Sequence, residues 1–382
     1  MSSLEKDHIG SPKHVNEAES FLEGESRTQF TPDDEVPKDK CKIVLFVMML
    51  HGLGTLIAWN VFITFAPLYF QKFKLKSETN PQPSYVTNFM NWVCICSQLP
   101  NLIVNMIGMF SGSGNLLVRI VISLIIVTGT CLFTAVFIYI DTSTFIADVQ
   151  LNAAVYFSIT VCLLIICIAS FFYVRKNRYF AYQMIVAKRA TESHGTFSLS
   201  DYIGVMKEYW LPLIDVYCVF FVTLMLFPSI LLSIHLYPLD RKYDLFISEN
   251  LFATVFVFLN FNLFAVIGSK IADYIRWPSP KYAWAPIFVR LLFIPIFLSC
   301  NYAPGGYRTW PVFIPNEWAV FVLISLMSIS HGYYSSISLM YAPHGAEPNK
   351  ARILGKMSAF FLVFGIASGI GCSFLATYVA HL

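Results

Sequence analysis

The sequence predicts an all-α integral membrane protein, a polytopic helix bundle, from its composition and from the length of its apolar runs. Of the 382 residues, 56% are hydrophobic and only 13% are charged, whereas soluble domains are about 45–50% apolar and about 25% charged. Nine apolar runs are long enough to cross the hydrocarbon core, which takes about 20 helical residues. Because the runs are continuous rather than alternating, transmembrane strands are excluded. The composition also excludes a nucleic-acid-binding module, a secreted disulfide scaffold and an ordinary soluble enzyme.

The chain begins with a polar tail, residues 1–42, that carries ten acidic and six basic residues. Such a segment cannot bury enough surface to fold alone, so we expect a disordered cytoplasmic tail. No apolar run precedes Ile43, so no cleavable signal peptide is predicted. The nine cysteines lie almost entirely in apolar runs, which indicates neither a disulfide framework nor a metal site.

Four membrane spans are predicted before a long connection and five after it. The predicted spans are residues 43–69, 86–109, 117–140, 151–173, 210–235, 248–268, 283–300, 317–340 and 357–379. This pattern divides the chain after the tail into an N-terminal helix group over 43–173, a cytoplasmic connecting loop over 174–209 and a C-terminal helix group over 210–382.

The basic residues of the connections predict the orientation. With a cytoplasmic N-terminus, the cytoplasmic connections carry thirteen Lys and Arg and the outer connections carry six. Nine spans then place the C-terminus outside the cell. The plasma membrane is the expected location, because residues 17–22 only approximate an acidic dileucine sorting signal.

Intramembrane polar residues are costly and therefore informative. On the second span, Asn91, Cys94, Gln98, Asn101 and Asn105 recur every three or four residues, which places them on one helix face. The stripe indicates either the lining of an aqueous path or hydrogen bonding between helices. Four amides on one face favour the path.

Two further positions offer the same choice between solute binding and packing. On the first span, Trp59 next to Asn60 could stack on a planar ligand and hydrogen-bond its edge, or it could be a packed indole beside a satisfied amide. On the sixth span, Asn260 and Asn262 are the corresponding candidates.

Away from the ends of the predicted spans, where Arg119, Glu249 and Glu317 lie, the charged residues are Asp215 and Arg290. Both lie at a similar depth near the cytoplasmic edge, where an isolated charge is expensive, so we predict that they interact. No carboxylate lies near a span midpoint, which disfavours an ion-driven pump. His51 and His331 are candidates either for proton transfer or for structural hydrogen bonding.

Small residues predict close helix contacts rather than chemistry. Gly365 and Gly369 form a Gly-x-x-x-Gly on the last span, a motif of backbone approach. The sequence contains no constellation of a catalytic triad, nucleotide-binding loop or metal cluster, so neither an enzyme nor a cofactor is predicted. The residues alone therefore predict a facilitative carrier or channel for a neutral solute.

Several motifs resemble the equilibrative nucleoside transporter family in the same order along the chain. They are GLGTLIAWN (52–60), which contains Gly52 and Gly54, FVTLMLFP (221–228), NFNLFAVIG (260–268), RLLFIPIFLSCN (290–301), Gly332-Tyr333 through Tyr341-Ala342-Pro343, and MSAFFLVFGIASGIGCSF (357–374). The resemblance implies an eleven-helix relative of the major facilitator architecture that moves nucleosides, and often nucleobases, down their gradients.

Carried over by position, the resemblance implies a substrate site formed by five residues. These are Trp59, Asn60, Gln98, Asn101 and Asn262. Structural or gating roles are expected for Gly52, Gly54, Asp215, Arg290, His331, Gly365 and Gly369. The family has an Asp and an Arg on its eighth helix where this chain has Ala265 and Ser269, and an Asn at the position of His331. A solute without a ribose is therefore an alternative substrate.

An interval that holds two helices in the family is nearly absent here. Between the third and fourth spans only residues 141–150 remain, where the family has its fourth and fifth helices. The resemblance therefore implies nine spans instead of eleven and a weakened N-terminal group. The alternative to a nucleoside carrier in the bilayer is therefore a truncated isoform that does not transport, or a regulatory protein. Such a protein would associate with another membrane subunit.

Overall fold

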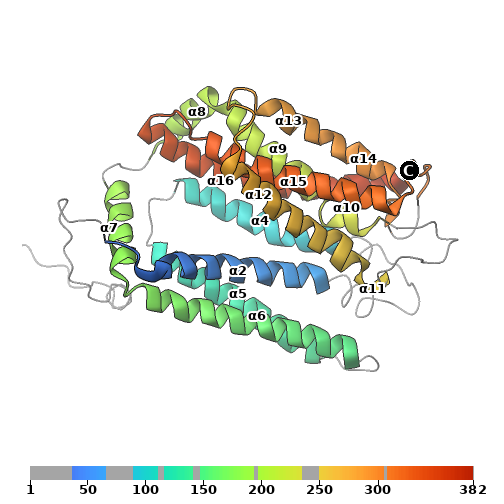
Figure 1. Ribbon diagram of the computed structural model, residues 1–382, viewed down its shortest axis with the longest axis horizontal. Coiled ribbons are helices and arrows are strands. Elements are labelled where there is room, and N and C mark those ends of the chain that lie inside the picture. Colours follow the sequence, from blue (N-terminus) through green and yellow to red (C-terminus); the bar gives the residue numbers. More distant parts are fainter. Residues whose placement is uncertain are drawn as a thin grey trace, which may run out of the picture. The chain divides into compact units, whose positions relative to one another are not determined.

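Every regular element in the described part of the chain is a helix. The computed structural model describes residues 37–65, 89–110, 116–140, 147–192, 197–234, 249–304 and 308–381 (Figure 1). Within these ranges six helices are long and apolar enough to cross a membrane, or seven if the bent pair Ser158–Val174 and Arg178–Ile185 is one span. This confirms an all-α, polytopic membrane fold.

Each of the nine predicted runs coincides with helical residues in the described ranges. At the run 283–300 the apolar helix is shorter, Trp284–Ser299, and at the run 117–140 the described side chains cover Ile120–Thr134. Whether all nine cross the bilayer stays a prediction. The tail up to residue 36 lies outside the described residues.

The helices form two compact units, residues 1–59 with 113–195 and residues 60–112 with 196–382. The first unit contains the 3-10 turn η1 (Lys40–Lys42), most of α2 (Ile43–Phe65), α5 (Leu116–Ile140), α6 (Ala147–Val174) and α7 (Arg178–Glu192). Its core includes Ala58, Leu124, Cys131, Leu164 and Cys167. The helix α7 is bent by 81° from α6.

The second unit contains the remaining helices. They are α4 (Phe89–Phe110), α8 (Leu199–Glu208), α9 (Trp210–Leu226), α10 (Ser229–Leu232), α11 (Glu249–Phe252), the π-helix η3 (Ala253–Leu259), α12 (Asn260–Tyr274), α13 (Trp284–Val289), the 3-10 turn η4 (Arg290–Leu292), α14 (Phe293–Ser299), α15 (Glu317–Tyr341) and α16 (Pro348–His381). Helices α9, α15 and α12 pack as neighbours, and α16 packs against both α9 and α4 (Figure 1).

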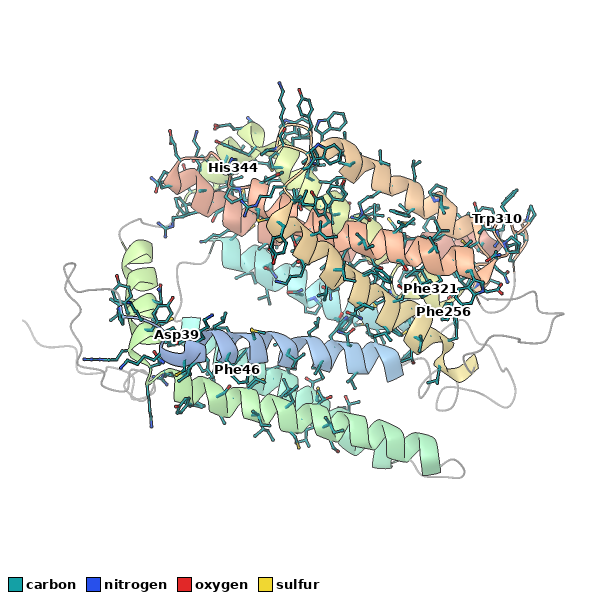
Figure 2. All side chains as sticks on the ribbon, in the orientation of Figure 1. Asp39, Phe46, Phe256, Trp310, Phe321 and His344 are labelled. Atoms are coloured by element: carbon teal, nitrogen blue, oxygen red, sulfur yellow. The ribbon has the colours of Figure 1, made fainter. Side chains whose placement is uncertain are left out.

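Aromatic packing and proline breaks shape the spans of the second unit. Phe256 of η3 meets Phe321 of α15 with ring centroids 5.0 Å apart (Figure 2). Helix α9 ends at Leu226, just before Pro228, which has no backbone N–H to continue the hydrogen-bond ladder. Pro295 similarly has no backbone N–H to donate to the carbonyl four residues earlier in η4. The 3-10 turn η4 separates α13 from α14.

Three details differ from simple expectations of the sequence. The predicted connecting loop 174–209 contains two helices, α7 and α8. Helix α8 begins at a capping interaction in which the Ser198 N–H donates to Asp201 Oδ2 at 2.8 Å. Helix α16 begins at Pro348, two turns before the apolar run, because polar residues at the end of a span are also helical. Helix α4, which is predicted from the sequence to belong to the N-terminal helix group, packs against α16 in the second unit. The division of the chain into helix groups at residues 173 and 210 remains a prediction from the sequence.

Candidate functional site

The predicted stripe on α4 contains a ladder of amide side chains. Asn105 Nδ2 donates to Asn101 Oδ1 at 2.9 Å, and Asn101 Nδ2 donates to Gln98 Oε1 at 3.2 Å. The Asn101 side chain is exposed, and those of Gln98 and Asn105 are half-buried. The sequence spacing of three and four residues produces these contacts, since such positions are neighbours on a helix. The ladder presents hydrogen-bonding groups on an exposed face.

The first part of the same stripe has a structural role. Asn91 is buried, and Ser373 Oγ of α16 donates to its Oδ1 at 2.9 Å. Cys94, one turn later, is also fully buried. Beside them, the rings of Trp92 and Phe374 pack edge to face at 5.2 Å. The stripe therefore divides into a helix contact at Asn91 and Cys94 and an exposed ladder at Gln98, Asn101 and Asn105.

Two other predicted binding residues meet in the second unit. Asn262 Nδ2 of α12 donates to Asn60 Oδ1 at 3.3 Å and to the Phe258 carbonyl at 2.8 Å. Asn260, by contrast, is buried between α12 and α15, donating to the Phe321 carbonyl and accepting from Ser325 Oγ. Trp59 is half-buried in the first unit. The structure thus brings together Asn60 with Asn262 and Gln98 with Asn101.

The predicted contact between Asp215 and Arg290 is wrong. Arg290, only 2% exposed, donates through Nη1 to the Val219 carbonyl at 3.0 Å and through Nη2 to Thr223 Oγ1 at 2.7 Å. Its Nε donates to Ser330 Oγ at 3.1 Å. Asp215 is buried too, but its Oδ1 has no hydrogen-bond partner among the described residues. The hydrogen-bond acceptors of the Arg290 guanidinium are therefore one backbone carbonyl and two side-chain hydroxyls, and the Asp215 carboxylate is not among them.

His331 belongs to the same buried cluster. Its Nδ1 lies 3.1 Å from Thr223 Oγ1, the hydroxyl that also binds Arg290. The imidazole stacks on the Phe261 ring at 5.7 Å and meets the Phe220 ring edge to face at 5.4 Å. His331 therefore joins α9, α12 and α15, as a structural residue would. The sequence reasoning missed Thr223 as the centre of this cluster, because one Thr in an apolar run carries no distinguishing signal.

The second predicted histidine lies in the first unit. His51 Nε2 is 3.3 Å from Ser170 Oγ of α6, and its ring lies 5.7 Å from that of Phe171. These contacts join α2 to α6 and are those of a packed, hydrogen-bonded side chain.

The predicted small residues divide into contact and open positions. A Cβ on Gly54 would lie 2.6 Å from Cys167 Sγ, and a Cβ on Gly365 would lie 2.6 Å from the Tyr217 carbonyl. A Cβ on Gly369 would collide with the Phe221 carbonyl, whereas one on Gly52 would meet nothing within 4 Å. Gly54, Gly365 and Gly369 therefore allow helices to approach closely, and Gly52 does not serve that purpose in this conformation.

The positions of the family's Asp and Arg lie at a close approach of two helices. A Cβ on Gly332 of α15 would collide with the Ala265 carbonyl of α12, and one on Gly268 would collide with the Ile329 carbonyl. One turn further along α12, Ser269 Oγ lies 2.9 Å from Ser336 Oγ of α15. Small side chains at 265 and 269 are thus part of a tight helix contact. Over the described residues, no group of three or more His, Cys, Asp or Glu could hold a metal ion.

Comparison with known proteins gives consistent similarities. A family model described as nucleoside transporter matches residues 105–378. Human equilibrative nucleoside transporter 2 is 24% identical, in an alignment that covers 89% of this chain and 98% of that protein. Human equilibrative nucleoside transporter 1 is 35% identical over 129 residues, which is 33% of this chain and 28% of that protein. Equilibrative nucleotide transporter 1 of Arabidopsis thaliana is 28% identical over 28% of this chain and 23% of its own length.

Proposed function

Since this chain belongs to the equilibrative nucleoside transporter family, we propose that it moves nucleosides or nucleobases down their gradient across a membrane. In this proposal two helix groups alternate in opening around a solute held near the bilayer midplane. The plasma membrane, a cytoplasmic N-terminus and an external C-terminus are part of the proposal. Neutral amides at the proposed site suit an uncharged, hydrogen-bonding solute.

The observation that carries the proposal is the exposed amide ladder of α4. Hydrocarbon offers no hydrogen-bond partner, so an exposed amide inside a span is costly unless water, solute or protein reaches it. Asn101 is exposed in the middle of a 22-residue apolar helix. We assign Gln98 and Asn101 to solute binding, together with the Asn60–Asn262 pair, whose amides lie in contact. Trp59 is proposed to stack on the base.

Thiol labelling tests whether the ladder faces water. Cysteines placed singly at 98, 101 and 105, in a chain whose exposed Cys41, Cys96 and Cys162 are replaced by Ala, should react with a small hydrophilic thiol reagent. Added uridine or adenine should slow the reaction. Cysteines at 102 and 103 are matched controls on the same helix and should react slowly. Fast labelling at 102 and 103 with none at 101 would remove the basis for the path.

A specific observation favours the alternative that this form does not transport. The alignment with human equilibrative nucleoside transporter 2 extends over 456 positions. Because 89% of the 382 residues is about 340, roughly a hundred of those positions have no residue of this chain. Only 6% of the α4 span is buried, as expected if neighbouring helices of the family are absent. In this alternative the chain is a regulatory subunit that associates with another membrane protein.

The contacts at Ala265 and Ser269 favour a second substrate class. Ser269 Oγ is engaged by Ser336, and no carboxylate or guanidinium stands at these two positions to bind sugar hydroxyls. A solute without a ribose would not need them.

Uptake by the purified chain in liposomes separates the three alternatives. Saturable uridine uptake supports the nucleoside carrier, adenine uptake without uridine uptake supports the solute without a ribose, and neither supports the non-transporting form. Replacing Asn101 with Ala should lower uptake severalfold, whereas Ile103→Ala, an exposed apolar change on the same helix, should not. Equal uptake by the two variants would contradict the proposed role of Asn101.

A further inference from the structure

A surface of exposed aromatic side chains lies between α12 and α13. Tyr274 is 86% exposed, Trp277 69% and Tyr282 59%, and Trp284 is also exposed. We call residues 274–284 the aromatic loop. Trp and Tyr are amphipathic, with an apolar ring and a polar atom, and they concentrate where a membrane meets water.

The fold fixes the backbone of the aromatic loop. Tyr333 Oη of α15 accepts from the Trp277 N–H at 3.0 Å and reaches the carbonyls of Ile275 and Trp277. Tyr341 Oη, at the end of α15, reaches the Pro278 carbonyl at 3.0 Å and the Arg276 carbonyl at 3.3 Å. Because the loop's backbone groups bond inward to these two hydroxyls, its large side chains are presented outward.

Two basic side chains of the aromatic loop have no carboxylate as an ion-pair partner within the described ranges. Arg276 and Lys281 are exposed and form no ion pair within the described ranges, whereas the nearby Lys270 is paired with Asp273 at 3.1 Å. Lys281 Nζ lies 5.7 Å from the centroid of the Tyr282 ring. The loop therefore combines exposed aromatic rings with two unpaired positive charges.

The loop lies at the more basic end of the second unit. Tyr341 and the start of α16 mark this end, near His344, and Trp310 lies at the opposite end (Figure 2). Described basic residues at this end, besides those of the loop, are Lys207, Lys270, Lys350, Arg352 and Lys356. Asp201, Glu208, Asp273 and Glu347 also lie at this end, and the described charged residues of the opposite end are Arg308, Glu249 and Glu317. An excess of Lys and Arg is typical of the side that faces an anionic leaflet.

We propose that the aromatic loop binds the headgroup of an anionic phospholipid in the adjoining leaflet. Arg276 and Lys281 would contact the phosphate, and Trp277 with Tyr282 would insert at the boundary between headgroups and acyl chains. The guanidinium suits phosphate because its N–H groups form a fixed fork. A lipid fits better than a soluble anion because the two cations are surrounded by exposed rings that continue directly from α12 and into α13.

Photolabelling in nanodiscs tests the proposal with the full chain. Nanodiscs of phosphatidylcholine with one-fifth phosphatidylserine would contain a trace of photoreactive phosphatidylserine, and labelled peptides would be mapped by mass spectrometry. Residues 274–284 should be labelled, and photoreactive phosphatidylcholine should label them much less. The double variant Arg276→Gln/Lys281→Gln should lose labelling by about tenfold, as expected for two charges near an anionic surface. Trp277→Ala should also reduce it.

Matched controls make the outcome decisive. Lys38→Gln/Lys40→Gln removes two exposed charges elsewhere, and Phe313→Ala removes an equally exposed ring at the opposite end of the unit, so both should keep full labelling. Raising salt to about 1 M should weaken labelling of the unmodified chain, because the Debye length falls to about 3 Å. Equal labelling by the two lipids, unchanged labelling of the double variant, or full competition by soluble glycerophosphoserine would each overturn the proposal.

Discussion

The helices α9 and α4 are both apolar spans of the second unit, yet they differ sharply in burial. Two-thirds of the α9 span is buried, 67%, against 6% of the α4 span. Helix α9 is enclosed by α15 and α16, and glycines at 365 and 369 of α16 lie directly against its backbone. On α4, the glycine at 108 has no atom near the position of a Cβ. Close packing against α9 therefore depends on glycines that lie at the helix contact, whereas the glycine of α4 lies at no such contact.

Polar residues have different surroundings in the two regions. Around α9 the polar groups of Arg290 and Thr223 are buried and bonded to one another, so they contribute to folding. On α4 the amide of Asn101 is exposed and bonded only within its own helix in the contacts described, so it contributes little to packing. Polar side chains thus stabilise the packing around α9, whereas the amide of Asn101 on α4 is exposed.

The largest expected effect tests the close packing of α9 with α16. Gly369→Ala should destabilise the chain by about 2 kcal/mol, because the new methyl would collide with the Phe221 carbonyl, which cannot move freely. Gly371→Ala is the matched control two residues away, where a Cβ meets nothing within 4 Å. Ala has the higher helix propensity, so the control should be neutral or stabilising. Thermal melting of the purified variants measures both, and a Gly369→Ala chain as stable as the control would contradict the close contact.

The next effect tests the buried cluster beside α9. Thr223→Val should cost about 2 kcal/mol, because it removes the acceptor of a buried guanidinium N–H. In a double-mutant cycle, Thr223→Val and Arg290→Gln should couple by about 1 kcal/mol or more, since the two side chains are in contact. The matched cycle pairs Asp215→Asn with Arg290→Gln and should show weaker coupling. A stronger coupling for Asp215 would restore the ion pair that the sequence predicts.

The sequence predicted the helices well and the contacts of single side chains less well. A continuous span of about 20 apolar residues is helical in lipid, so every run coincides with helical residues, although α12 and α16 extend beyond their runs. The spacing on α4 likewise placed Gln98, Asn101 and Asn105 on one helix face, and the structure adds the hydrogen bonds that join them. The approximate depth of Asp215 and Arg290 could not decide which groups they meet. That depends on the packing of α9 against η4 and α15, which the pattern of one span does not contain.

The smallest expected effect lies at the surface, where α8 meets the start of α16. Lys350 Nζ lies 2.8 Å from Glu208 Oε2, and this hydrogen bond lowers the pKa of the Glu208 carboxyl from its ordinary value. A carboxyl with a lowered pKa stabilises the fold above its unfolded pKa, and the stabilisation is lost as pH falls through the folded pKa. Lys350→Gln should therefore lower the melting temperature slightly at pH 7, and the difference from the unmodified chain should shrink as pH falls below the ordinary carboxyl pKa of about 4.3. Lys207→Gln, an exposed lysine of α8 without an ion pair among the described residues, should show no such pH-dependent difference. Melting curves of the three chains between pH 3 and pH 7 measure the effect. A Lys350→Gln difference that persists at the lowest pH would mean that the lysine acts through packing of its stem on α8 rather than through its charge.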